Sequence, residues 1–141
     1  MVRPNAVVPI DAFDGTHIPA ADGTQDVVMF VDVLHHTIDP RVLLREARRV
    51  ARRAVLIKDH TRNGPMAEAT LRFMDFVGNA RFGVSLPYNF WCRKQWDEAI
   101  HELGLEVEVW RSRLGLYPQW ANWLFGRSLH FVGLLRIPGA G

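Results

Sequence analysis

The chain has 141 residues, 48% of them hydrophobic and 23% charged, which is enough apolar material for one globular core and excludes a disordered or collagen-like chain. Its formal net charge of +2 is too small to indicate a nucleic acid as partner. Cys92 is the single cysteine, which excludes an internal disulfide and a cysteine-based metal cluster. No metal is expected, since a metal site at the pair His35-His36 is the weakest interpretation of these two residues. The sequence has no apolar run of the length of a secretion signal or a membrane span. We therefore expect a cytoplasmic protein with no membrane span.

The first half of the chain reads as alternating strands and a helix. Val7 to Ile10 predict a short extended segment, and the unbroken apolar run Val27 to Val31 predicts a strand that is covered on both faces, at the centre of a parallel sheet. Asp39 and Pro40 predict the start of a helix, because Asp is a favoured N-cap and Pro suits the first helical position. That helix should run to about residue 52, with a solvent-facing arginine side, and be followed by a second buried strand at residues 54–59. A strand, helix and strand in this order predict an α/β fold.

The second half is less regular. Met66 to Asn79 predict a helix that is apolar around much of its circumference and is therefore buried or covers something. Arg93 to Leu103 predict an amphipathic helix closed by Gly104. Leu105 to Trp110 alternate as a half-exposed strand does, and His130 to Ile137 predict a last strand.

Six short motifs occur in a fixed order along the first half, and we interpret them together. They are Asp14-Gly15, Ile18-Pro19, Asp22-Gly23, Asp26-Val27-Val28, Val33-Leu34-His35-His36 and Leu43-Leu44-Arg45-Glu46. In this order and spacing they resemble the class I S-adenosylmethionine-dependent methyltransferases, in particular the type 11-like group that contains the ubiquinone and menaquinone biosynthesis enzymes. The resemblance implies a three-layer, Rossmann-like α/β methyltransferase fold with a mostly parallel sheet. It also implies S-adenosylmethionine as cofactor and methyl transfer to a small hydrophobic acceptor.

We expect a single domain, residues 1–141, made of three segments. Residues 7–60 would hold the adenine loop, the central strand and the crossover helix. Residues 61–92 would form a lid-like helical and aromatic segment, and residues 93–141 a C-terminal helix and strands. The aromatic side chains of the lid-like segment and of the C-terminal region have an alternative interpretation, because aromatic residues at helical spacing are more often part of the core.

Asp14 has the chemistry of an adenine-binding residue. Adenine offers an amine as donor beside a ring nitrogen as acceptor, so a loop carboxylate and a neighbouring backbone N–H can pair with both. Asp14 would accept, the amide of Gly15 or Thr16 would donate, and Ile18 would cover the ring. The alternative is a local turn in which the Asp14 side chain caps its own loop.

Other candidate residues lie where the parallel strands end. Val31 and Asp32 follow the first strand at the sheet edge where ligands of α/β proteins collect, and the resemblance implies that this position contacts the methionine part of the cofactor. His36 or His60 would take a proton from the acceptor. The alternative for the pair His35-His36 is that one side chain packs on the crossover helix while the other is solvated. For His60, which follows Asp59, the alternative is a capped turn.

Two features of the resembling enzymes are not found in this sequence: a glycine-rich turn after a first strand, and an acidic residue that binds the ribose hydroxyls. By the resemblance, the sequence lacks the first two strands, is truncated at its N-terminus, and leaves the Val27 strand with an uncovered edge. Hydrogen bonds to a charged group contribute roughly 1.5 to 3 kcal/mol each, so cofactor binding would be weakened about a thousandfold. Whether the chain is an enzyme therefore stays open. The alternative is a non-catalytic methyltransferase-like subunit that binds a protein partner, or itself, through the uncovered edge.

Overall fold

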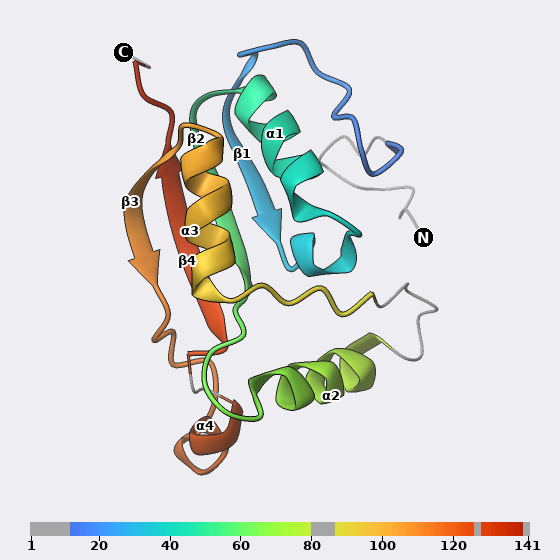
Figure 1. The fold of residues 1–141 in the computed structure, drawn as a ribbon, viewed down its shortest axis with the longest axis vertical. Helices are drawn as coiled ribbons and strands as arrows, with labels where there is room; N and C mark the ends of the chain where they lie inside the picture. Colours follow the sequence, from blue (N-terminus) through green and yellow to red (C-terminus); the bar gives the residue numbers. More distant parts are fainter. Residues whose placement is uncertain (1–11, 80–86, 126–127, 140–141) are drawn as a thin grey trace, which may run out of the picture.

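The computed structural model describes residues 12–79, 87–125 and 128–139, so the segment Val7 to Ile10 lies outside the described residues. The elements follow the chain in the order β1, η1 (a single turn of 3-10 helix), α1, β2, α2, α3, β3, α4 and β4 (Figure 1). Their bounds are β1 Gln25–Val31, η1 Leu34–His36, α1 Pro40–Val50, β2 Ala51–His60, α2 Ala67–Asn79, α3 Arg93–Glu102, β3 Glu106–Arg111, α4 Gln119–Phe125 and β4 His130–Arg136. None of the described helices is both long and apolar enough to cross a membrane.

The strands form one sheet in the order β1-β2-β4-β3. β1 and β2 run parallel, with Val28 opposite Val55, and they are joined through α1. β4 lies between β2 and β3 and runs antiparallel to both. The expected α/β fold class is confirmed. Three of the four described strands point the same way, and β4 alone runs against them, between β2 and β3.

The start of α1 follows the predicted local rule. The Asp39 carboxylate accepts a hydrogen bond of 2.9 Å from the Arg41 N–H, and Pro40 occupies the first helical position. The helix ends at Val50, two residues earlier than expected, because the chain enters β2 at Ala51. α3 also matches its prediction: Trp96 and Ile100 are buried, and Gly104 follows with a φ of +62°, a value that suits glycine.

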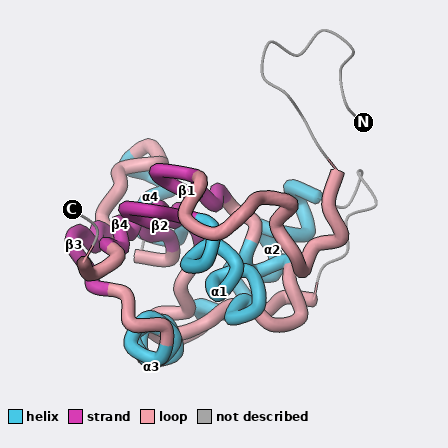
Figure 2. Tube along the Cα trace, turned by 90° about the horizontal axis from the view of Figure 1, so that it is seen from above, coloured by secondary structure: helices cyan, strands magenta, loops and turns pink. Residues whose placement is uncertain are grey.

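Two helices cover one face of the sheet. Figures 1 and 2 show α1 and α3 side by side on this face, where their side chains and those of the strands form the main core. Leu44 of α1, Trp96 of α3 and Phe131 of β4 are among the most deeply buried residues in it. The described residues therefore supply two of the three layers that the fold class implies.

β1 differs from its prediction as a central strand covered on both faces. It is the terminal strand of the described sheet, and it pairs with β2 along one edge. Phe30 is buried under α1, whereas Val27, Met29 and Val31 on the opposite face are 50%, 61% and 50% exposed. The prediction was wrong because no described helix packs against this second face. No described strand other than β2 pairs with β1.

α2 is buried along one side. Ala67 and Leu71 pack with Phe90 and Leu129 in a small second core. Its other apolar side chains, Phe73, Phe76 and Val77, are each more than half exposed. The expectation that this helix is buried or covers something therefore holds for one side, because the second core is small and touches only that side of the helix.

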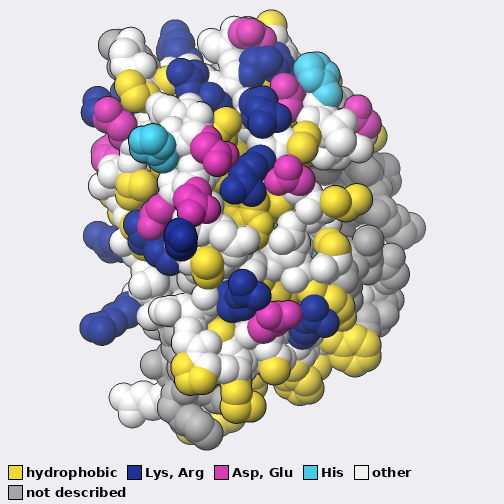
Figure 3. Space-filling view, viewed as in Figure 1, with side chains coloured by type: hydrophobic (Ala, Val, Ile, Leu, Met, Phe, Trp, Pro, Cys, Tyr) yellow, Lys and Arg dark blue, Asp and Glu magenta, His cyan; other side chains and the backbone are white. Residues whose placement is uncertain are grey.

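The face that carries α1 and α3 has mixed charge. Figure 3 shows Lys and Arg side chains interleaved with Asp and Glu over these helices. Ion pairs such as Arg41 with Glu102 and Arg93 with Asp97 account for part of this pattern. Charges paired in this way are solvated and contribute little each to stability.

Candidate functional site at the carboxyl ends of β1 and β2

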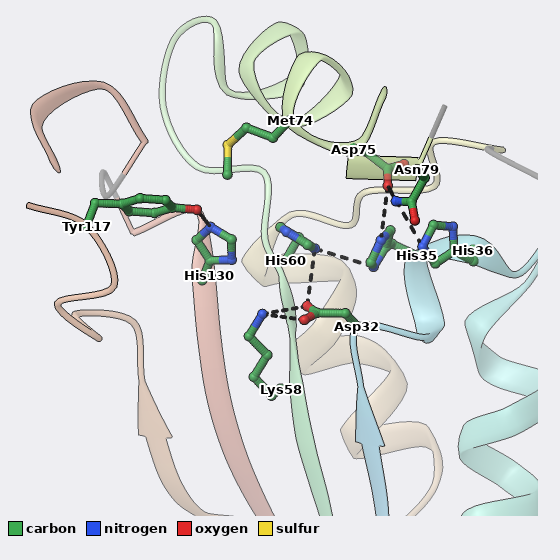
Figure 4. A pocket seen from close by; sticks show the side chains of 10 residues that line it. All are labelled: Asp32, His35, His36, Lys58, His60, Met74, Asp75, Asn79, Tyr117 and His130. Atoms are coloured by element: carbon green, nitrogen blue, oxygen red, sulfur yellow. Dashed lines mark hydrogen bonds and ion pairs between the residues drawn. The ribbon is translucent and has the colours of Figure 1, made fainter. Parts of the chain in front are cut away.

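A cavity of about 350 Å³ opens where β1 and β2 end, at the edge of the sheet where ligands of α/β proteins collect. Ten side chains line it, four of them histidines, and they come from β2, β4, α2 and the segments that follow β1 and β3 (Figure 4). The lining residues are Asp32, His35, His36, Lys58, His60, Met74, Asp75, Asn79, Tyr117 and His130. The cavity is therefore polar and is assembled from segments far apart in the sequence.

Asp59 anchors the floor of this site. Its carboxylate is fully buried and accepts hydrogen bonds from the Leu34 N–H at 2.9 Å, from the His35 ring at 2.6 Å and from the His60 N–H at 2.7 Å. Burial by itself raises the pKa of Asp59, but the hydrogen bonds from His35 and His60 outweigh burial and hold that pKa below its usual range. Asp59 is thus ionised, and its hydrogen bonds hold η1 against the end of β2.

Both histidines of η1 point toward α2. The Nε2 atoms of His35 and His36 each lie 3.8 Å from Oδ1 of Asp75, and Asp75 also accepts a hydrogen bond of 2.6 Å from Asn79 (Figure 4). His35 is buried, and the side chain of His36 is 21% exposed. The alternative of one packed and one solvated histidine is therefore wrong, because the tight 3-10 turn presents both rings to the same carboxylate.

Asp32 lies at the opposite wall. Its backbone φ is +51°, which is uncommon for a residue with a side chain, and its carboxylate accepts two hydrogen bonds of 2.6 Å from Nζ of Lys58. The bend at Asp32 ends β1 and turns the chain toward η1. The ion pair is part-buried, and Nδ1 of His60 lies 3.7 Å from the same carboxylate.

His130 and Tyr117 close the third side. The Tyr117 hydroxyl lies 3.0 Å from Nε2 of His130, and the His130 ring packs against His60 with ring centroids 4.5 Å apart. Burial lowers the pKa of His130 to about 4, with further lowering by His60 and Lys58, so His130 is neutral at pH 7. Burial, together with the charge of Asp32, raises the pKa of Tyr117.

The Asp14 loop, residues 13–19, lies apart from this cavity. Oδ1 of Asp14 accepts from the Thr16 N–H and the His17 N–H, both at 2.7 Å, and from the Thr16 hydroxyl at 2.8 Å. These hydrogen bonds lower the pKa of Asp14. This is the local turn weighed against the adenine interpretation. It uses Oδ1 of the exposed carboxylate and the Thr16 amide, so the adenine interpretation depends on Oδ2 and the Gly15 amide.

Glu46 of α1 holds the Asp14 loop in place. It accepts from the Ile18 N–H at 3.0 Å and from Arg49, whose guanidinium also donates to the carbonyl oxygens of Ile18 and Ala20. His17 lies 2.8 Å from the same carboxylate. The hydrogen bond from Arg49 holds the pKa of Glu46 at about 2, so an ionised pair fastens the loop to α1.

The structure brings together some of the predicted residues and separates others. Asp32, His36 and His60 line the cavity, and Val31 precedes it with half of its side chain exposed. Asp14, Gly15, Thr16 and Ile18 lie on the loop beside α1.

Sequence reasoning did not name six of the lining residues as site residues: Lys58, Met74, Asp75, Asn79, Tyr117 and His130. His130 could not be found from the sequence, because it stands opposite His60 only once β2 and β4 pair in antiparallel register. Asp75 carried a weak signal, since it is an acidic residue between the apolar Met74 and Phe76.

Comparisons with known proteins agree with this architecture. Residues 2–57 match the family described as Methyltransferase domain. No curated protein matches the chain. Among solved structures, an S-adenosylmethionine-dependent methyltransferase from Aquifex aeolicus is 17% identical with a TM-score of 0.57, over 92% of this chain and 54% of that one.

Two further structures have the same fold. An S-adenosylmethionine-dependent methyltransferase from Methanosarcina mazei is 13% identical with a TM-score of 0.56, over 88% of this chain and 64% of that one. The [4+2]-cyclase SpnF is 14% identical with a TM-score of 0.59, over 91% of this chain and 55% of that one. The chain thus spans between about half and two thirds of these structures.

The chain therefore has the fold of the S-adenosylmethionine-dependent methyltransferases. Residues 2–57 match the methyltransferase domain family. The similarity to SpnF shows that the fold also serves a cyclase, so the function of this chain has to be argued from its site.

Proposed function

We propose that the chain is part of the catalytic domain of an S-adenosylmethionine-dependent methyltransferase that methylates a small acceptor bound in the cavity at the ends of β1 and β2. The observation that carries this proposal is the location of the cavity, next to Val31 and Asp32, where the class holds the methionine part of its cofactor. A volume of about 350 Å³ is at the lower end of the range for ligand pockets and suits a small acceptor.

Some of these residues would bind the cofactor and the acceptor, and others would accept a proton. Asp14 and the Gly15 amide would pair with adenine, and Ile18, which packs against the core, would cover its ring. The apolar body of the acceptor would lie against Met74 and the Tyr117 ring, while His60 or His36 would receive the proton of the reacting group. Methyl transfer is an in-line displacement at the sulfonium carbon, so holding donor and acceptor collinear and dry would supply most of the rate.

Calorimetry with S-adenosylhomocysteine, the product of the reaction, tests this proposal. The wild-type chain should bind it with a dissociation constant of about 0.1 to 1 mM, weaker than a typical cofactor. Asp14→Asn removes the charge but keeps the size of the side chain, and it should weaken binding at least tenfold. Asp97→Asn is the matched control, because Asp97 is exposed on α3 and bonds Arg93.

Two results would contradict the proposal. If no heat is detected at 5 mM ligand, roughly fivefold above the weakest affinity expected, the described site does not bind the product. If Asp14→Asn and Asp97→Asn bind equally well, the product binds elsewhere on the chain. A methyl acceptor screen with radioactive cofactor would follow, with His60→Gln expected to lower turnover more than product binding.

A second candidate function rests on the exposed face and free edge of β1. A strand that ends the described sheet and carries Val27, Met29 and Val31 half exposed can accept a partner strand. We infer a non-catalytic subunit as the alternative. Light scattering distinguishes the methyltransferase from the non-catalytic subunit. If the chain is a non-catalytic subunit, it should form a stable complex or dimer that Met29→Lys disrupts. Neither the wild-type chain nor Met29→Lys should then bind the product.

A further inference from the structure

We propose that the wall of the cavity formed by η1 and α2 is a binding site for a divalent transition-metal ion, with His35, His36 and Asp75 as ligands. The ligand atoms are Nε2 of each histidine and a carboxylate oxygen of Asp75, and they all lie within 4.8 Å of one another. Figure 4 shows Asp75 reaching down from α2 between the two rings of η1. The proposal concerns metal binding and does not depend on methyl transfer.

The spacing of these atoms is too long for hydrogen bonds and close to what an ion requires. Each histidine nitrogen lies 3.8 Å from Oδ1 of Asp75. Metal–ligand bonds of about 2.1 Å place neighbouring ligand atoms roughly 3.0 to 3.5 Å apart in octahedral or tetrahedral geometry. Side-chain movements of up to about one ångström would therefore complete the coordination.

The contacts of His35 leave its Nε2 for a cation. Nδ1 lies 2.6 Å from Oδ1 of Asp59, so in the neutral ring we assign the proton to Nδ1 from this hydrogen bond. The lone pair of Nε2 then faces the Asp75 carboxylate across 3.8 Å, and both groups are acceptors. A positive ion between them satisfies both, and a carboxylate that holds the far nitrogen of a ligand histidine is the usual arrangement of metal sites.

Asp75 itself supplies a second observation. Its residue exposure is 7%, and within the described part of the chain its Oδ2 atom has no hydrogen-bond partner. A buried carboxylate oxygen without a partner is costly, and a bound cation would offset that cost. Asn79 donates to Oδ1 at 2.6 Å and so orients the carboxylate toward η1.

A neighbouring trio, His35, Asp59 and His60, is a weaker site. Nδ1 of His35 and Oδ1 of Asp59 are only 2.6 Å apart and already joined by a hydrogen bond, which leaves no room for an ion between them. His60 also donates its backbone N–H to the same oxygen. Asp59 therefore acts as the partner of a ligand and not as a ligand.

The donor set indicates the class of metal. Two imidazoles and one carboxylate suit zinc, iron, manganese or cobalt in the divalent state and leave further coordination positions open. Those positions would face the cavity, because all three ligands line it. An oxygen atom of a bound small molecule, such as a hydroxyl or carboxylate group, is the ligand that this arrangement would accept.

The test uses the tag-free chain, stripped with a chelator and titrated with zinc chloride by calorimetry and with cobalt chloride by visible absorption. One equivalent should bind with a micromolar dissociation constant. His36→Gln and Asp75→Asn should each weaken binding at least tenfold. His101→Gln, at an exposed histidine of α3, should leave it unchanged.

The outcomes are distinguishable. If circular dichroism shows that Asp75→Asn does not fold, metal binding by His36→Gln is compared with that of the wild-type chain instead. His36 is only part-buried, so this substitution should leave the fold intact. The proposal is overturned if the wild-type chain binds neither ion below 1 mM, about a thousandfold weaker than expected. It is also overturned if His60→Gln or His101→Gln weakens binding while His36→Gln does not.

Discussion

The Asp14 loop and the histidine cluster, which comprises His35, His36, Asp59, His60 and Asp75, are both polar but are stabilised by different contacts. Asp14 bonds residues two and three positions further along an exposed loop. Asp59, in contrast, bonds residues 24 and 25 positions earlier and is fully buried. The turn at Asp14 therefore forms from local sequence, and Glu46 and Arg49 fasten it to α1. The cluster, in contrast, exists only in the folded sheet and also stabilises it.

Of the substitutions considered, Asp59→Ala should lower the free energy of unfolding most. The substitution leaves the Leu34 N–H, the His35 ring and the His60 N–H without their shared acceptor in a buried site. We expect the free energy of unfolding to fall by about 3 to 5 kcal/mol, measured by urea denaturation. Asp97→Ala on α3 is the control and should leave the midpoint nearly unchanged. A loss below about 1 kcal/mol for Asp59→Ala would show that the cluster does not stabilise the sheet.

The next largest effect should be a pH dependence of the free energy of unfolding that comes from His130 in the cavity. Burial lowers the pKa of His130 from 6.5 to about 4, so between these values the unfolded chain binds a proton that the folded chain does not. The stabilisation is present above pH 6.5 and is lost as the pH falls toward 4, by up to about 2 kcal/mol. Urea denaturation at several pH values should give a flatter profile for His130→Gln than for the wild-type chain. Parallel profiles would mean that His130 does not titrate as described.

Glu46→Gln should have a smaller and more local effect. It removes the charge that holds Arg49 and the Ile18 N–H, so the Asp14 loop should loosen from α1. We expect a loss of about 1 kcal/mol in the free energy of unfolding. Hydrogen exchange of the Ile18 amide should become at least tenfold faster, while amides of β2 keep their rates. Equal acceleration in both places would mean that the pair stabilises the whole domain and not the loop.

The smallest effect on stability should come from Asp14→Asn, because the carboxylate is exposed and its partners stay accessible to water. Its unfolding midpoint should match that of the wild-type chain, even though product binding is expected to weaken. A clear drop in the midpoint would mean that the turn is structural, and the comparison between loop and cluster would then fail.

Elements that depend on neighbouring residues were predictable from the sequence. The start of α1 at Asp39 and Pro40, the end of α3 before Gly104 and the turn at Asp14 all follow from contacts within a few positions. For the same reason the buried strand β2 was predictable from its apolar run. The residues of the Asp14 loop were identified as an adenine-binding candidate by their order and spacing, and that role stays a prediction.

The tertiary structure alone decided what the cavity contains and which faces stay exposed. Asp75 meets His35 and His36 because α2 folds back over η1, and His130 meets His60 because β4 pairs with β2 in antiparallel register. In β1, the apolar run could not reveal that one face has no described helix against it. A sequence fixes contacts within a turn through backbone geometry, but contacts between distant segments depend on strand order and helix placement, which no local pattern encodes.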